Sequence, residues 1–401
     1  MKTKNIGFNR NKYLPRIQAF FQKTPVKVLT GMRRVGKSTI LKQLSINYSE
    51  NTDQVFIDKD LYEFDNIRTA KDLTLYIKRN LPKGGAIFID EVQEIEEWEK
   101  SVVSFQKQGQ YDLFITGSNA HLLSSELATR LSGRYVEFCI YPLTFREFLE
   151  FHKLEPELGF KLYLRYGGLP GLKELDLKDS VVYAMIQGIY NTVLLKDVVQ
   201  RHNIRNVRTL ENICRFVFDN IGQIFSAQKI SKYLKNQHVS MSPETAIEYL
   251  NYLHSAQVIH RVPRFDIKGK RLLEIHEKYF INDIGLRHAL LGYREGDISQ
   301  ILENIVYLEL RGRGYEVYVG RWRDVEIDFV ASNEKGRVYI QVCYLLADER
   351  TVEREFGALE KIDDNYEKIV LSMDKHWGGD RNGIKRFYLP EWLLGPDPDL
   401  K

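Results

Sequence analysis

The segment from Gly31 to Ser38 has the spacing G-x-x-x-x-G-K-S, and each fixed residue in it suits the binding of phosphate groups. Gly31 and Gly36 allow the backbone to turn its N–H groups toward phosphate oxygens, at the positive end of the following helix dipole. Lys37 offers a positive charge to the β- and γ-phosphates during binding and catalysis. Ser38 offers a hydroxyl ligand to Mg²⁺, with Thr39 beside it on the helix. The pattern predicts a site for ATP with Mg²⁺.

The residues around this loop predict the elements that hold it. An apolar run at 26–29 comes before the loop, and apolar residues with helical spacing follow at Ile40, Leu41 and Leu44. The order is therefore strand, loop, helix. An ordinary glycine turn is the alternative, and it does not account for this order.

Two further apolar segments end in polar residues that suit phosphate chemistry. Residues 85–92 read GAIFIDEV, a strand that ends in Asp90 and Glu91. We expect Asp90 to hold Mg²⁺ through water and Glu91 to polarise the attacking water. Residues 111–119 read YDLFITGSN, and we expect Asn119 to orient that water. Ser118 has two interpretations, a γ-phosphate contact or a helix cap.

Strands expected at 54–58 and 135–142 complete the sheet. Five strands separated by helical segments predict an α/β fold with a doubly wound parallel sheet. A length of 401 residues is too great for one core of ordinary size, so several domains are expected.

The chain resembles the bacterial and archaeal AAA-type ATPases whose C-terminal domain is related to restriction endonucleases. The motifs that carry this resemblance span nearly the whole sequence: GMRRVGKST, IFIDEVQ, ITGSNA, LATRLSGRY, YPLTFREF, RYGGLPG, KYFINDIGLR and VEIDFV. The resemblance implies an AAA+ P-loop core with strand order 5-1-4-3-2, followed by three further domains. We expect the core at 1–142, a helical lid at 143–208, a winged helix at 209–297 and a PD-(D/E)xK nuclease-like domain at 298–401.

Two arginines of the LATRLSGRY motif, Arg130 and Arg134, precede the last core strand. Related ATPases present an arginine finger there to the γ-phosphate, either in the same chain or to a neighbouring subunit. Arg134 is the preferred candidate, and a surface ion pair is the alternative. A finger that acts on a neighbour requires a homo-oligomer.

Further nucleotide contacts are expected from residues other than Gly31, Gly36 and Lys37. Arg33 and Arg34 project from the phosphate loop and either contact the nucleotide or pair with acidic residues of segment 94–96. The turn RYGGLPG is similar to the glycine-x-proline turn of signal-transduction ATPases, which implies that Gly168 and Pro170 contact adenine. A plain turn between lid helices is the alternative.

The middle of the chain predicts a helix-turn-helix with a hairpin. Ser226 caps one helix, Ser242 caps the next, and VIHRV and RLLEIHEKYF form the strands of the hairpin. In DNA-binding versions of this fold the second helix enters the major groove and basic wing residues contact phosphate, here Lys268, Lys270 and Arg271. Glu244 and Glu248 on that helix oppose this interpretation. A module that only holds the nucleotide domain closed is the alternative.

The last hundred residues resemble a metal-dependent nuclease with altered chemistry. Glu303 and Asp328 suit Mg²⁺, but the second strand carries Gln341 and Cys343 where such enzymes have a carboxylate and a lysine. A glutamine carbonyl coordinates weakly and a thiol does not replace an ammonium, so we expect a degenerate site. Four arginines near it suit phosphates or form a solvated face: Arg311, Arg313, Arg321 and Arg323.

The composition of the sequence argues against a membrane protein, a secreted protein and a zinc or disulfide protein. No apolar stretch approaches the length of a membrane span, and the basic start is not followed by the apolar run of a signal peptide, so we expect a cytoplasmic protein. Three cysteines without CxxC spacing suggest neither disulfides nor zinc. The leading hypothesis is an ATP-driven machine whose later domains act on DNA. The competing hypothesis is a nucleotide-dependent signalling switch that binds a protein partner.

Overall fold

The computed structural model describes residues 8–48, 52–118, 131, 133–173, 175–375 and 379–395, with backbone alone for 274–276 and 295. Asn119 and Arg130 lie outside these residues. Contacts divide the chain into two units, residues 1–141 with 255–257, and residues 142–254 with 258–401. Among the described residues, no helix combines the length and the apolar character that crossing a bilayer requires.

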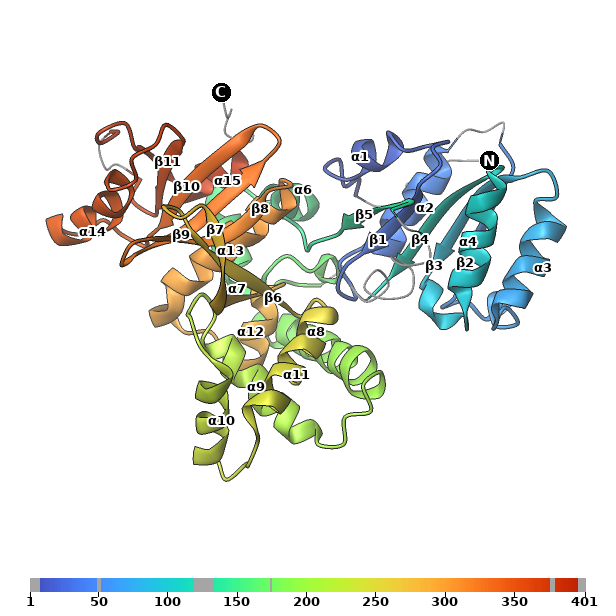
Figure 1. Ribbon diagram of the computed structural model, residues 1–401, viewed down its shortest axis with the longest axis horizontal. Coiled ribbons are helices and arrows are strands. Elements are labelled where there is room, and N and C mark those ends of the chain that lie inside the picture. Colours follow the sequence, from blue (N-terminus) through green and yellow to red (C-terminus); the bar gives the residue numbers. More distant parts are fainter. Residues whose placement is uncertain are drawn as a thin grey trace. The chain divides into compact units, whose positions relative to one another are not determined.

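The first unit contains a five-stranded sheet in which all paired neighbours are parallel (Figure 1). Its strand order is β2-β3-β4-β1-β5, which is the expected order 5-1-4-3-2 counted from the opposite edge. The strands are β1 (Val26–Thr30), β2 (Gln54–Asp58), β3 (Gly85–Asp90), β4 (Tyr111–Gly117) and β5 (Tyr135–Cys139). The predicted α/β parallel sheet is confirmed.

Helices cover this sheet because its central strands are apolar on both faces. The helices are α1 (Leu14–Gln18), α2 (Lys37–Asn47), α3 (Ala70–Asn80) and α4 (Trp98–Gln108). Side chains of α3 and α4 join Ile87 and Ile115 in one buried cluster. Phe88 and Phe114 alternate with those residues and so face the opposite side, where their rings stack at 4.7 Å.

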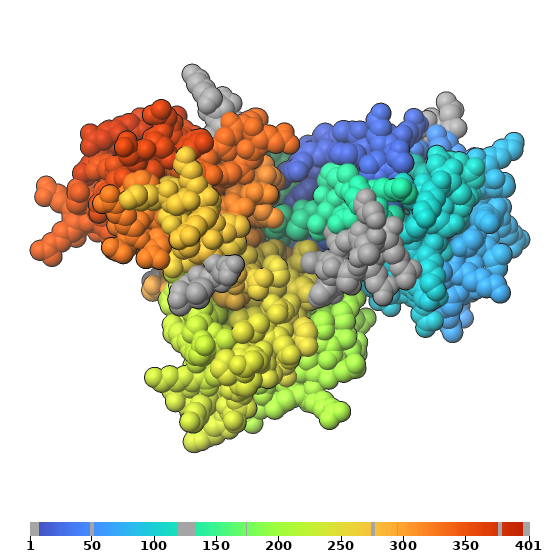
Figure 2. Space-filling model, in the orientation of Figure 1, coloured from blue at the N-terminus to red at the C-terminus, as the bar shows by residue number. Residues whose placement is uncertain are grey.

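The second unit begins with helices. Those before its sheet are α6 (Phe145–His152), α7 (Pro156–Tyr166), α8 (Asp179–Thr192), α9 (Val207–Asp219), α10 (Ala227–Asn236) and α11 (Pro243–Ser255). The predicted caps are present, since Ser226 accepts a hydrogen bond from Lys229 N and Ser242 accepts one from Thr245 N. Figure 2 shows α10 and α11, coloured yellow-green to yellow, at the surface of this unit.

A seven-stranded sheet follows, in the order β12-β11-β10-β9-β8-β6-β7. Its strands are β6 (Ile259–Asp266), β7 (Arg271–Ile281), β8 (Glu316–Trp322), β9 (Val325–Asn333), β10 (Gly336–Val342), β11 (Glu367–Ser372) and β12 (Lys385–Tyr388). The later helices are α12 (Ile284–Leu291), α13 (Ile298–Gly312), α14 (Glu349–Glu360) and α15 (Leu389–Leu394). The predicted hairpin is β6 with β7, and it joins the sheet because β6 pairs with β8 over Arg264 to Asp266.

Candidate nucleotide-binding site

The glycines of the loop between β1 and α2 are required by backbone geometry. Gly36 caps α2 with φ 100° and ψ 20°, a left-handed conformation. Gly31 has φ 151°, and a Cβ there would lie 2.5 Å from the carbonyl oxygen of Ile140. Side chains at these positions would strain the loop or push it from the end of β5. The loop is therefore held close against the sheet and leads directly into the helix N-terminus.

Lys37 lies inside this loop. Its side chain is 4% exposed, and its Nζ donates hydrogen bonds to the carbonyl oxygens of Gly31 at 2.9 Å and Met32 at 3.1 Å. A phosphate oxygen is a stronger acceptor for an ammonium than a neutral carbonyl. The neighbouring predicted residues, Arg34, Ser38 and Thr39, are exposed. The loop thus combines a buried cation with accessible polar groups.

Asp90 is brought to Ser38, the other predicted ligand of Mg²⁺. It ends β3, is 1% exposed, accepts a hydrogen bond from the hydroxyl of Thr116, and lies close to Ser38. Burial raises the pKa of Asp90, and the interactions with Thr116 and Ser38 lower it in part. One carboxylate and one hydroxyl suit Mg²⁺ that is shared with substrate phosphates. No larger group of acidic, histidine or cysteine ligands occurs in the described part of the chain.

Glu91 follows Asp90 in a left-handed conformation, with φ 52° and ψ 52°. Its backbone N–H donates to Thr116 Oγ1 at 3.0 Å, and its carboxylate accepts a hydrogen bond from Gln93. A non-glycine residue in this region is strained and is held by its surroundings. Ser118, just beyond β4, is fully buried. The predicted roles of Glu91 and Ser118 stay predictions.

Sequence reasoning missed Thr116, which hydrogen bonds both carboxylate-bearing residues at the end of β3. The one signal for it was a hydroxyl residue inside the otherwise apolar run LFIT. Strand pairing of β3 with β4 brings it to Asp90, and sequence spacing alone does not reveal that neighbour.

Arg134 lies at the amino-terminal end of the strands, whereas the phosphate loop lies at their carboxyl end. Its carbonyl accepts a hydrogen bond from Val26 N at 2.9 Å, where β1 begins, whereas the phosphate loop starts after Thr30. Four to five strand residues separate the two places, roughly 15 Å along the sheet. This position does not support a finger acting within the same chain. For the exposed Arg134 side chain, action on a neighbouring subunit and a surface ion pair both stay open.

Gly168 and Pro170 belong to the second unit and are held there by its own residues. The Gly168 N–H donates to Asp283 Oδ2 at 2.7 Å, and its carbonyl accepts from Leu143 N at 2.7 Å. Pro170 begins a short 3-10 turn that ends at Leu172. The predicted contact with adenine stays a prediction.

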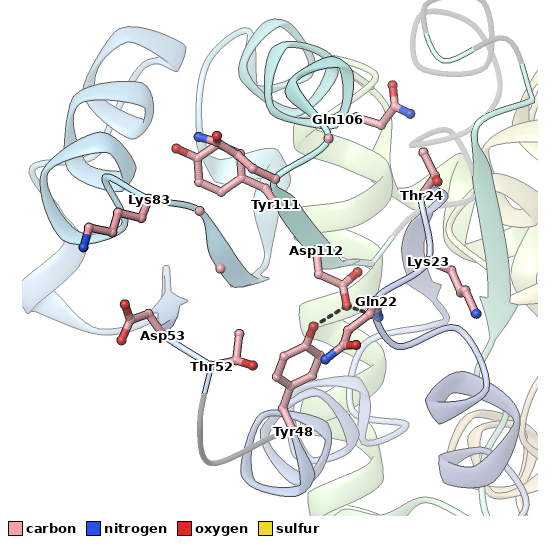
Figure 3. A pocket seen from close by; sticks show the side chains of 14 residues that line it. Gln22, Lys23, Thr24, Tyr48, Thr52, Asp53, Lys83, Gln106, Tyr111 and Asp112 are labelled. Carbon is pink, nitrogen blue, oxygen red and sulfur yellow. Dashed lines mark hydrogen bonds between the residues drawn. The ribbon is translucent and has the colours of Figure 1, made fainter.

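A cavity of about 460 Å³ in the first unit is distinct from the phosphate loop. It is lined by residues that precede or begin strands, among them Thr24, Asp53, Gly85 and Tyr111. It therefore lies at the amino-terminal ends of the strands, and the phosphate loop lies at their carboxyl ends. Figure 3 shows Asp112 accepting hydrogen bonds from Tyr48 and from the backbone of Gln22, both at 2.7 Å. Tyr48 and the Gln22 backbone already donate hydrogen bonds to this carboxylate, and the cavity is separate from the phosphate loop. It is therefore no candidate for the nucleotide.

The structure brings the predicted residues Asp328 and Gln341 together, but one expectation about the C-terminal region was wrong. The Gln341 carbonyl accepts a hydrogen bond from Asp328 N at 2.7 Å, and its weak coordination of a metal stays a prediction. Arg313 does not present itself to phosphate, because it pairs with Glu309 at 2.7 Å and its side chain is 6% exposed. Cys343 is buried, and burial raises the pKa of its thiol to about 12.

Known proteins resemble this chain over most of its length. Residues 23–149 match the family described as AAA domain, and residues 158–297 match a domain of unknown function. An uncharacterized protein of Haemophilus influenzae is 35% identical over 403 residues, covering 96% of this chain and 98% of that protein. An uncharacterized protein of Methanocaldococcus jannaschii is 29% identical over 388 residues, covering 88% of this chain and 85% of that protein.

Among the solved structures that share the fold is the Walker-type ATPase of Pyrococcus abyssi. It matches with a TM-score of 0.51 and 15% identity, covering 71% of this chain and 95% of that one. At this identity the likeness concerns the fold alone.

Proposed function

This chain belongs to a family of AAA-type P-loop ATPases, and from this premise we propose that it binds ATP with Mg²⁺ and hydrolyses the γ-phosphate. The observation that carries the proposal is the approach of Ser38, the residue after the buried Lys37, to Asp90 at the end of β3. A hydroxyl and a carboxylate that suit Mg²⁺ are thus brought together next to the lysine of the loop.

Each residue has a role in the proposed reaction. Lys37 leaves the loop carbonyls and binds β- and γ-phosphate oxygens, while the N–H groups at the start of α2 hold the phosphates. Ser38 and Asp90 hold Mg²⁺, which neutralises the charge that develops on the phosphate oxygens. Glu91 accepts a proton from the attacking water or orients it. The expected product pair is ADP and phosphate.

Turnover of ATP by purified variants tests this proposal. Lys37→Ala is expected to lose nucleotide binding, and Glu91→Gln is expected to bind ATP but lower turnover by roughly 100-fold or more. Lys42→Ala is the matched control, because Lys42 is exposed on the same helix α2. A Glu91→Gln variant with wild-type turnover would exclude Glu91 from the reaction.

For the partner, we propose that the second unit binds DNA. ATP binding and hydrolysis drive a conformational change of this unit on the DNA. The exposed hairpin residues Lys268, Lys270 and Arg271 favour it. The exposed carboxylates Glu244 and Glu248 on α11 favour the alternative, a switch that binds protein. Contacts to phosphates release counterions, so log affinity for duplex DNA should fall with log salt concentration. A slope near zero, together with turnover that DNA does not change, would favour the switch.

A further inference from the structure

Three carboxylates in the second unit enclose the ammonium of one buried lysine. They are Glu303 on α13 and Glu326 and Asp328 on β9, and we refer to them as the acidic cluster. Lys278 on β7 is 3% exposed, and its Nζ lies 2.8 Å from Glu326, 3.2 Å from Glu303 and 3.8 Å from Asp328. A residue that precedes the whole nuclease-like segment thus supplies the positive charge at its centre.

The polar groups beside the cluster are already bonded within the protein. Asp328 Oδ2 accepts a hydrogen bond from Val342 N at 2.8 Å, and Gln341 Oε1 accepts from Asp328 N. The amide nitrogen of Gln341 donates to Glu355 at 3.1 Å, and Glu355 also pairs with Arg354 at 2.7 Å. The side chains beside the acidic cluster are therefore held by bonds within the protein.

Electrostatics explain why a cation is needed at this place. Burial alone would lower the pKa of Lys278, but the surrounding carboxylates outweigh it and raise the pKa. Burial, with Asp328 nearby, raises the pKa of Glu303 to about 8, and burial raises the pKa of Asp328 to about 6. Lys278 lowers the pKa of both carboxyl groups and so favours their ionised forms against the burial that raises it.

The same contact ties the hairpin to the rest of the sheet. Between β6 and β7, the backbone of Lys278 lies opposite that of Val262. This position is outside the short stretch, Arg264 to Asp266, over which β6 pairs with β8. Nearby, the Asn304 side chain accepts from Ile281 N at 2.8 Å and donates to Ile281 O at 2.9 Å. Side chains of α13 and β9 thus hold the part of β7 that lies beyond this pairing.

We propose that the Lys278 ammonium is the resident cation of the acidic cluster and occupies the place that a divalent metal would take. The C-terminal sheet then carries a closed, metal-free ionic centre that fixes the hairpin. Any nucleic acid or protein that this unit binds is not cut through a metal ion held by Glu303 and Asp328.

Manganese binding to the full-length chain without nucleotide tests the proposal, with bound Mn²⁺ counted by electron paramagnetic resonance. Wild type and Asp328→Asn are expected to bind the same amount, because the pocket of the wild type takes no metal. Lys278→Met is expected to bind one more Mn²⁺ per chain, and adding Asp328→Asn to it should abolish that gain. Lys268→Met, at the exposed tip of the same hairpin, is the control and should match wild type.

Two results would overturn the proposal. The first is a loss of Mn²⁺ from the wild type on Asp328→Asn, since the pocket would then hold metal beside Lys278. The second is a folded Lys278→Met chain that gains no Mn²⁺. If Lys278→Met does not fold, the comparison of wild type with Asp328→Asn still decides the question. Failure of the ATPase proposal would leave this comparison unaffected, because no nucleotide is present.

Discussion

The side-chain hydroxyl of Thr116 accepts a hydrogen bond from the backbone N–H of Glu91, with 3.0 Å between oxygen and nitrogen. The same hydroxyl donates to the Asp90 carboxylate, so one residue of β4 holds both the strained backbone and the carboxylate at the end of β3. Because Asp90 also contacts Ser38, this hydroxyl is part of the support for the proposed Mg²⁺ site.

Replacing Thr116 with valine should lower ATP turnover by about 10-fold, because it leaves the buried Glu91 N–H without its acceptor and removes the Thr116 donor from Asp90. Thr116→Ser keeps the hydroxyl and should stay close to wild type. Steady-state kinetics at varied Mg²⁺ concentration measure the effect, with thermal unfolding as a check on folding. Equal turnover for the valine and serine variants would mean that the hydroxyl does not support the site.

The affinity for ATP with Mg²⁺ should fall as the pH is lowered, beginning above the ordinary carboxyl pKa of 3.8. Burial raises the pKa of Asp90, and a protonated carboxyl no longer favours the cation. Isothermal titration across pH measures this dependence, and ATP titrated with a chelator present is the control. In Asp90→Asn the part of the pH dependence that requires Mg²⁺ should disappear; its persistence would assign the titration to another group.

Arg134→Ala should lower turnover by roughly 1000-fold if the side chain acts as a finger on a neighbouring subunit. Mixing Arg134→Ala chains with Lys37→Ala chains should then restore part of the activity. At mixed interfaces an intact phosphate loop meets an intact Arg134. Arg79→Ala, an exposed arginine of the same unit, is the control. Wild-type turnover of Arg134→Ala alone would leave the surface ion pair as the explanation.

Asp283→Asn should change how stability depends on pH. Burial raises the pKa of Asp283 to about 7 from 3.8, although N–H groups of Gly168, Gly285 and Leu286 lower it in part. The folded state therefore holds this proton more tightly than the unfolded chain. The contribution is complete below pH 3.8 and is lost as the pH rises through 7.

The measurement is the difference in free energy of unfolding between wild type and Asp283→Asn, from urea titrations between those pH values. That difference should fall by at most about 1.4 kcal/mol per pH unit, because asparagine does not titrate. Taking the difference removes the contributions of other buried groups such as His288, whose pKa burial lowers to about 4. A difference that is constant with pH would show that Asp283 stays ionised on folding.

The local order of residues by itself determined the phosphate loop, the strands of the first sheet and the two carboxyl residues at the end of β3. These features follow from spacing within a few residues, such as Gly31 to Ser38 or the apolar run before Asp90. Backbone conformation and helix or strand period depend mainly on near neighbours, so a single sequence reveals them. The caps at Ser226 and Ser242 were predicted for the same reason.

Only the tertiary structure decided which distant side chains share a pocket. Strand pairing brings Thr116 to Asp90. It also puts Arg134 at the amino-terminal end of the strands, away from the phosphate loop. Lys278 and Glu303 are 25 positions apart, and the folding of β7 against α13 joins them in one ionic centre. Such contacts depend on how whole elements pack, and no short spacing in the sequence records that packing.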